Sequence, residues 1–238
     1  MLFTSTRAAY LLSGSFLLLG CNGLTDGGGP SSQVYAGEAT GTAIPADERL
    51  PPANPDDYRL PWTCGEAYVV TQGNNGDECG ILGNHLGIEK YAWDFGVPLR
   101  TPIRAVRAGT VTLAAMYSPP GSECFDGCPN DKGGSGLEQE ACCSRCLYSA
   151  NRVNVEHADK VVSSYSHLSS IVVTEGQQVA AGQLLGYSGT SGCSTGPHMH
   201  FQIMYDCPAG YCQSLPLAFD DASVPSCGDH PMSQNNCS

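Results

Sequence analysis

Residues 195–203 read Thr-Gly-Pro-His-Met-His-Phe-Gln-Ile and show the clearest alternation of polar and apolar side chains in the chain. On a β-strand, successive side chains project to opposite faces of the sheet. His198, His200 and Gln202 would therefore share one face, and the apolar residues between them would share the other. The stretch predicts a strand with an imidazole-bearing polar face backed by a core face.

A second alternating stretch precedes it in the chain. Residues 91–95 read Tyr-Ala-Trp-Asp-Phe, so the aromatic side chains would face the core and Asp94 would face the other way. A carboxylate among aromatic residues in a β-strand needs a partner, because burying an unpaired charge is costly. Two partners are possible from the sequence: an arginine, with Arg104 and Arg107 as candidates, or a metal ion.

The rest of the chain also consists of short apolar runs separated by Gly and Pro. These runs are Pro102–Ala115, Arg152–Glu156, Val161–Leu168, Ile171–Val173 and Gln183–Tyr187. None sustains a helical period, and residues 157–160 have the composition of a hairpin turn. The sequence predicts a mainly β domain, built as an antiparallel sheet or barrel.

Five segments are expected from composition. Residues 1–20 predict an export signal and residues 21–57, rich in Gly, Pro and acids, a flexible tether. The folded domain would occupy residues 58–220. It would contain a cysteine-rich insertion at residues 118–147 and be followed by a disulfide-stapled tail at residues 221–238.

The export signal ends in Leu18-Leu19-Gly20-Cys21, which resembles a bacterial lipobox. Lipidation of Cys21 would anchor the chain to a membrane of the cell envelope, on its periplasmic or outer side. The alternative is an ordinary cleaved signal, with Cys21 free or in a disulfide. Which membrane would hold the anchor is not apparent from the sequence.

The charge balance excludes one large class of partners. The chain has 238 residues, with 11 Lys and Arg against 23 Asp and Glu, for a formal charge of −12. Phosphate contacts need a clustered basic surface, so we expect no nucleic-acid binding. For the oligomeric state we expect a monomer.

Cysteine parity supports export. If Cys21 carries lipid, twelve of the 13 cysteines remain, an even number that fits up to six disulfides outside the cytosol. The insertion holds five cysteines, whose spacing also resembles a zinc cluster, but an oxidising compartment favours disulfides. We expect Cys193 to pair with the odd cysteine of the insertion. The expected local pairs are Cys64–Cys79, Cys207–Cys212 and Cys227–Cys237.

Several motifs occur together in one order between about residues 80 and 205. They are His85-Leu86-Gly87, Tyr91-Ala92-Trp93-Asp94-Phe95, Gly109-Thr110-Val111, Tyr165-Ser166-His167-Leu168, Gly186-Tyr187-Ser188-Gly189 and Gly196-Pro197-His198-Met199-His200-Phe201. In this order they resemble the lysostaphin-type (LytM-like) zinc endopeptidases, which cut peptide bridges of bacterial peptidoglycan. The resemblance implies a β fold of the duplicated-hybrid-motif type and peptidoglycan peptides as substrate.

The same resemblance implies roles for five residues. His85, Asp94 and His200 would bind one Zn²⁺, and His167 and His198 would be the catalytic pair. The position four residues before Asp94, where the family most often has its first histidine ligand, is Lys90. A protonated lysine is a poor zinc ligand, and His85 fits the longer spacing that some members of the family have.

The chemistry of these residue types agrees with that implication. Two imidazoles and one carboxylate leave a fourth zinc position open, as catalytic sites require. The motifs contain no glutamate of a His-Glu-x-x-His helix, so proton transfer would fall to His167 and His198. Tyr165, two positions before His167, would contact substrate if the strand continued regularly.

Two other functions remain possible from the sequence. One is a non-catalytic relative that binds wall peptides or activates another hydrolase, and the other is a disulfide-rich envelope protein whose histidines bind nothing. Outside the proposed site, His157 and His230 are expected to be polar surface residues. Surface or ion-pairing positions are likewise predicted for Arg104, Arg152 and Lys160.

Overall fold

The computed structural model describes residues 58–77, 85–118, 150–192, 194 and 196–237. These residues belong to one compact unit, residues 44–238. The predicted export signal, Cys21, the tether, and residues 119–147 of the insertion lie outside the described residues, as do Cys79 and Cys193.

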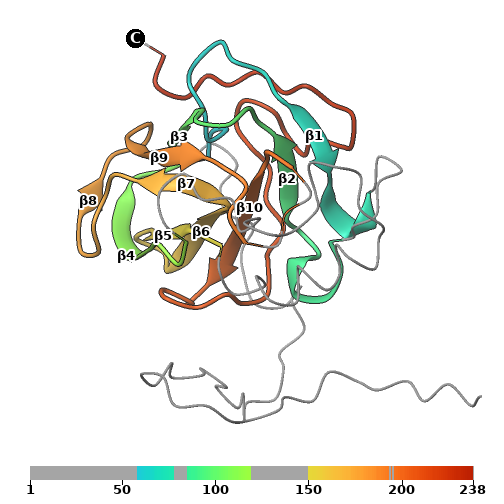
Figure 1. The fold of residues 1–238 in the computed structure, drawn as a ribbon. Helices are drawn as coiled ribbons and strands as arrows, with labels where there is room; N and C mark the ends of the chain where they lie inside the picture. Colours follow the sequence, from blue (N-terminus) through green and yellow to red (C-terminus); the bar gives the residue numbers. More distant parts are fainter. Residues whose placement is uncertain (1–57, 78–84, 119–149, 193, 195, 238) are drawn as a thin grey trace, which may run out of the picture. The chain divides into compact units, whose positions relative to one another are not determined.

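Within the described residues, ten strands form two antiparallel sheets (Figure 1). The larger sheet has seven strands, in the order β1 (Val69–Gln72), β2 (Trp93–Gly96), β10 (Met199–Tyr205), β6 (Val161–Ser166), β5 (Arg152–Glu156), β4 (Gly109–Ala115) and β8 (Gln178–Val179). The smaller sheet has the order β3 (Pro102–Arg104), β9 (Leu184–Ser188) and β7 (Leu168–Ile171). The predicted mainly antiparallel β fold is confirmed.

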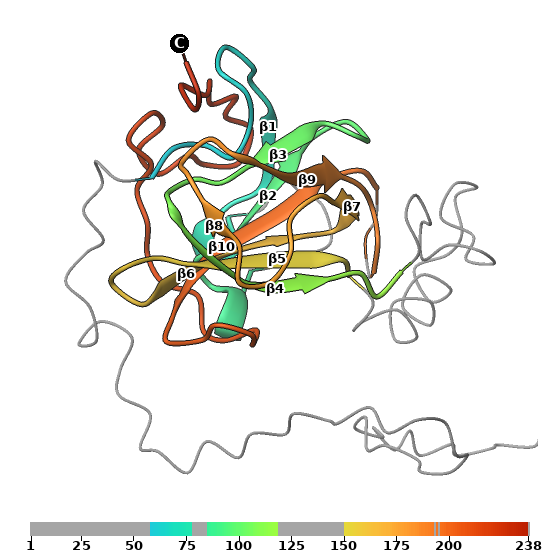
Figure 2. The same ribbon diagram turned by 90° about the vertical axis from the view of Figure 1, so that its left-hand side faces the viewer.

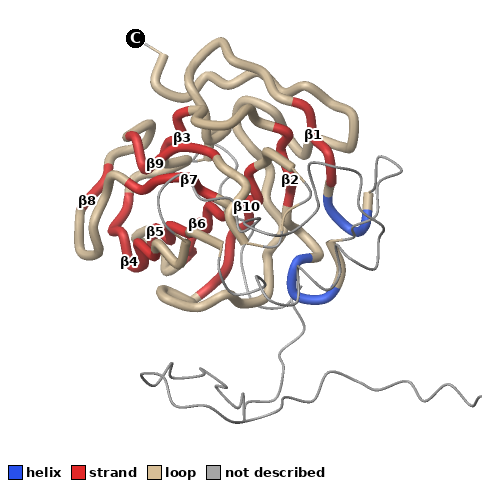
Figure 3. Tube along the Cα trace, viewed as in Figure 1, coloured by secondary structure: helices blue, strands red, loops and turns tan. Residues whose placement is uncertain are grey.

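Helical structure is confined, within the described ranges, to two short 3₁₀ turns, shown in blue in Figure 3. They are η2 (Asn74–Gly76) and η3 (Gly87–Glu89), one on each side of the segment that leads to His85. No helix in this part of the chain is long and apolar enough to cross a bilayer.

Strand β10 lies between β2 and β6 and separates the two faces as its alternation predicts. Met199, Phe201 and Ile203 are fully buried in the main hydrophobic core. The opposite face carries His200, which pairs in register with Asp94 of β2 and Ser166 of β6. Antiparallel pairing therefore brings a carboxylate and an imidazole side by side from positions 106 residues apart.

The core between the sheets is rich in aromatic rings. Phe201 packs against Trp93, Tyr165 and Phe219, with ring centroids 5.4 to 6.5 Å apart. Aromatic contacts at this spacing stabilise the core beyond what the burial of the apolar area of the rings contributes. They make β10 and β2 a rigid base for the polar face on their other side.

The run Val161–Leu168 is divided by His167. This residue has φ +64°, so β6 ends at Ser166 in the larger sheet and β7 begins at Leu168 in the smaller one. A positive φ is uncommon for residues other than glycine. The predicted hairpin at residues 157–160 is confirmed, and its first residue, His157, donates its backbone N–H to Val161.

The C-terminal segment packs along the beginning of the domain. Met232 forms a β-bridge with Ala67, and Cys237 is bonded to Cys64. The predicted pairs Cys64–Cys79 and Cys227–Cys237 are therefore wrong, because the segment folds back onto residues 64–67 and not onto itself. The predicted pair Cys207–Cys212 is confirmed.

The disulfides Cys64–Cys237 and Cys207–Cys212 should differ in their effect on stability. Cys64–Cys237 joins residues 173 apart, whereas Cys207–Cys212 joins residues five apart. Because loop-closure entropy grows with loop length, we expect the variant Cys64→Ser/Cys237→Ser to lose about 3 kcal/mol more than Cys207→Ser/Cys212→Ser. Denaturant unfolding of the mature protein measures both values. Equal losses would contradict this expectation.

Candidate metal centre and active site

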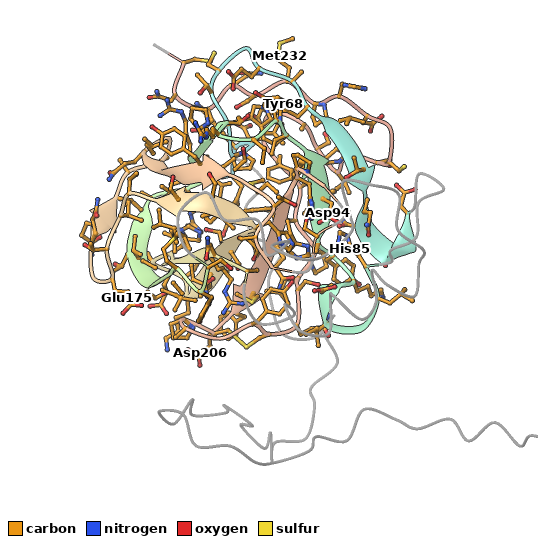
Figure 4. All side chains as sticks on the ribbon, in the orientation of Figure 1. Tyr68, His85, Asp94, Glu175, Asp206 and Met232 are labelled. Atoms are coloured by element: carbon orange, nitrogen blue, oxygen red, sulfur yellow. A yellow bond between two sulfur atoms is a disulfide. The ribbon has the colours of Figure 1, made fainter. Side chains whose placement is uncertain are left out.

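Three buried side chains converge on the polar face of the larger sheet. His85 comes from the segment between η2 and η3, Asp94 from β2 and His200 from β10, and one ligand atom of each lies within 4.8 Å of the others. His200 Nδ1 is 2.9 Å from Asp94 Oδ1, and His85 Nε2 is 3.4 Å from the same oxygen. Figure 4 shows His85 and Asp94 close together beside β2.

This donor set fits a zinc ion. Zinc binds imidazole nitrogen and carboxylate oxygen at about 2.0–2.2 Å, which places neighbouring tetrahedral donors about 3.3 Å apart. The distances from Asp94 Oδ1 to the two imidazoles, 2.9 and 3.4 Å, lie on either side of that value. Small movements would bring all three atoms to bonding distance of one ion.

Hydrogen bonds on the far side of each ring orient the two histidines of this cluster. His85 Nδ1 lies 3.2 Å from the carbonyl oxygen of Gly73, which can only accept. His200 Nε2 lies 3.1 Å from the amide oxygen of Gln202. The proton of each neutral ring therefore belongs on the far nitrogen, and the lone pair of the near nitrogen faces the centre.

His167 and His198 lie beside this cluster, with ring centroids 4.4 Å apart. His198 precedes β10 and its Nε2 is 3.8 Å from Asp94 Oδ2, whereas the His167 ring is 6.2 Å from that of His200. His167 Nδ1 donates to the carbonyl of Ser191 and His198 Nδ1 to that of Gly196, at 2.6 and 2.8 Å. In its neutral form each ring then has an unprotonated Nε2 with a free lone pair.

The pKa shifts follow from this crowding. Burial alone would raise the pKa of the Asp94 carboxyl, but the neighbouring imidazoles of His198, His200 and His85 hold that pKa well below its usual range. Burial, reinforced by neighbouring His198, lowers the pKa of His167 to about 3. Asp94 is therefore a carboxylate and His167 a neutral imidazole at neutral pH.

Two residues that the sequence analysis did not single out complete the surroundings of His200. Tyr211 accepts a hydrogen bond from His200 Nε2 at 2.8 Å and donates its hydroxyl to Glu89 Oε1 at 2.7 Å. Burial and the nearby Glu89 carboxylate raise the pKa of Tyr211, which keeps the phenol protonated. The only sequence signal near Tyr211 was the expected Cys207–Cys212 pair, which indicates an ordered loop. No feature of the sequence connected this loop with His200.

The prediction that Tyr165 contacts substrate is wrong. Its side chain is fully buried in the core, where its hydroxyl accepts from the backbone N–H of Val106 at 2.9 Å. Tyr165 and His167 would share a face only on a regular strand, and the positive φ of His167 ends that regularity.

The alternative partners of Asp94 are also resolved. Arg107 pairs with Asp159 at 2.6 Å, and Arg104 bonds to Thr63 and the carbonyl of Gly182. Neither arginine is recorded in contact with Asp94, whose carboxylate instead faces imidazoles.

The other basic residues near the motifs have different roles. Lys90 is exposed, with its ammonium 5.0 Å from the centre of the Tyr91 ring. His157 is buried, contrary to expectation, because its ring bonds to the carbonyl of Ala108 and the hydroxyl of Ser163.

Residues 140–210 match the family described as Peptidase family M23. The matched residues include His167, His198 and His200. His85 and Asp94 precede the match, so the structure adds the two remaining members of the site.

Comparison with individual proteins finds similar peptidases. The chain is 42% identical over 57 residues to the peptidoglycan DD-endopeptidase ShyA of Vibrio cholerae, covering 24% of this chain and 13% of the relative. It is 30% identical over 155 residues to the glycyl-glycine endopeptidase ALE-1 of Staphylococcus capitis, covering 65% and 34%. The matched segments thus span only 13% and 34% of the length of these curated relatives.

Among solved structures, the catalytic domain of lysostaphin from Staphylococcus simulans is 29% identical, with a TM-score of 0.39, covering 58% of this chain and 81% of that one. The sequence matches and the order of the site residues agree with the resemblance drawn from the motifs. Residues 140–210 therefore match peptidase family M23, and the chain is similar to the lysostaphin-type members of that family.

Proposed function

We propose that this protein is a zinc-dependent endopeptidase that hydrolyses peptide cross-links of bacterial peptidoglycan. The observation that carries the proposal is the convergence of His85, Asp94 and His200 beside the paired rings of His167 and His198. Relatives named as peptidoglycan and glycyl-glycine endopeptidases support the substrate class. A non-catalytic relative is not favoured, because all five side chains are present and gathered in one place.

In this mechanism His85, Asp94 and His200 would hold Zn²⁺ through the donor atoms that face one another. The ion, when bound, supplies Lewis acidity that makes water a stronger acid and polarises the scissile carbonyl. One of His167 and His198 accepts the proton of the attacking water at its Nε2. The other stabilises the developing oxyanion or returns a proton to the leaving amine.

Digestion of purified sacculi tests the proposal. The mature protein with one equivalent of zinc should release peptide fragments, and His85→Ala and His198→Ala should release almost none. Mass spectrometry of the fragments identifies the cleaved bond. An absence of release by the zinc-loaded protein would contradict the endopeptidase assignment.

We also propose attachment to the cell envelope through a lipid on Cys21, the lipobox cysteine. Metabolic labelling with a fatty acid should mark the wild-type protein and leave Cys21→Ser unlabelled and soluble after export.

The Tyr211 hydroxyl should tighten zinc binding by fixing the His200 ring. Partners of this kind typically contribute about 10- to 100-fold to metal affinity. We expect Tyr211→Phe to weaken zinc binding by about 10-fold, measured by competition with a chromophoric chelator. Tyr205→Phe, at the exposed end of β10, is the matched control and should bind as the wild type does. Unchanged affinity in Tyr211→Phe would show that Gln202 alone orients the ring.

A further inference from the structure

Arg152, the first residue of β5, is a half-buried arginine with one buried polar atom that has no hydrogen-bond partner among the described residues. Arg59 and Arg107 pair with Asp220 and Asp159, whereas Arg152 forms no ion pair with any described carboxylate. Its Nε atom is buried without a hydrogen-bond partner. The prediction of a surface or pairing role is therefore wrong for Arg152.

Arg152 lies on the same face of the larger sheet as the proposed active site. The pair Val153–Tyr165 faces the core, so the next pair along, Arg152 beside Ser166, faces the other way. Ser166 is in register with His200, and His200 with Asp94. Arg152 is thus on the metal-binding face, two strands or about 10 Å from His200 in the sheet. Figure 2 shows β5, β6 and β10 as neighbouring strands.

One side chain lies between the guanidinium and the metal ligand. Arg152 Cζ is 5.1 Å from the centre of the Tyr211 ring, whose hydroxyl bonds to His200. The cation–π contact orients the guanidinium, while its buried Nε has no hydrogen-bond partner among the described residues. Burying a charge without an anionic partner is costly, so a structure that retains one is expected to have a ligand for it.

We propose that Arg152 binds a free carboxylate of the substrate peptide and thereby selects cross-links that carry one near the cleaved bond. A guanidinium matches a carboxylate through two parallel hydrogen bonds, a geometry that an ammonium lacks. The proposal rests on the proposed endopeptidase function and narrows its substrate class. A bridge made only of glycine has no carboxylate to offer, whereas a diamino acid carries one beside the cross-linked amine.

Two carboxylates of a cross-linked peptide could be the ligand: the one on the diamino acid that bears the cleaved bond, and the one at the C-terminus. Amidating each in turn distinguishes them. We expect one of the two amidations, and not the other, to lower kcat/KM of the zinc-loaded wild-type protein by about 10- to 100-fold, mainly through KM. In Arg152→Gln the ratio between free and amidated substrate should fall to about one, and Arg152→Lys should restore part of it.

Arg59→Gln removes the same charge from an exposed site and should keep the wild-type ratio. A wild-type enzyme indifferent to both amidations, or Arg152→Gln with an unchanged ratio, would overturn the proposal. If neither the free nor the amidated substrates are cleaved, the proposed endopeptidase function is wrong, and peptide binding then tests the role of Arg152. Calorimetry with the free and amidated peptides should then show a preference for the carboxylate in the wild type and none in Arg152→Gln. Equal or absent binding in the wild type would overturn the proposal.

Discussion

His200→Ala should lower kcat/KM by at least about 1,000-fold, which corresponds to about 4 kcal/mol of transition-state stabilisation. Of the two histidines proposed as zinc ligands, His200 has the shorter contact to Asp94, 2.9 Å, and the far side of its ring contacts Gln202 and Tyr211. Without its imidazole two donors remain, and the buried carboxylate of Asp94 loses a partner. Zinc should be lost together with activity.

Metal analysis and sacculus digestion, made on the same preparations, check this result. His230→Ala is the matched control, since His230 is exposed and belongs to none of the site contacts. Chelation of the wild type should reproduce the loss, and added zinc should reverse it there but not in His200→Ala. A His200→Ala protein that keeps both zinc and turnover would refute its assignment as a ligand.

His167→Ala and His198→Ala should have the second largest effect, through kcat and not through the metal. General acid–base groups contribute about 10² to 10⁴ in rate, so each variant should lose a factor in that range. Their imidazoles are oriented by carbonyl oxygens of Ser191 and Gly196. Because the two rings act on one proton-transfer sequence, the double variant should lose less than the product of the single losses.

Zinc binding by these two variants is the control measurement. Both should bind one equivalent of zinc with nearly the wild-type affinity, and steady-state kinetics should place the loss in kcat with little change in KM. Loss of zinc in either variant would move that residue from the catalytic pair to the ligand set. A change in KM alone would indicate a role in substrate binding only.

Local patterns predicted much of this site, and particular residues show where such prediction stops. The alternation around Asp94 and His200 correctly placed both side chains opposite the core, because the period of a strand is a property of the backbone. The same rule failed for Tyr165, since His167 adopts a positive φ and the chain moves from one sheet to the other. That conformation depends on the packing of both sheets and has no signature in the residue type.

The sequence by itself determined the β class of the fold, the faces of the side chains on β2 and β10, and the set of histidines from which a site could be built. Only the tertiary structure decided that His85 reaches Asp94 while Lys90 stays exposed, that Cys64 pairs with Cys237, and that Tyr211 bridges His200 and Glu89. It also left Arg152 without an acidic partner among the described residues. The physical reason is that side-chain alternation is local, whereas these contacts join residues brought together by sheet register and the return of distant loops.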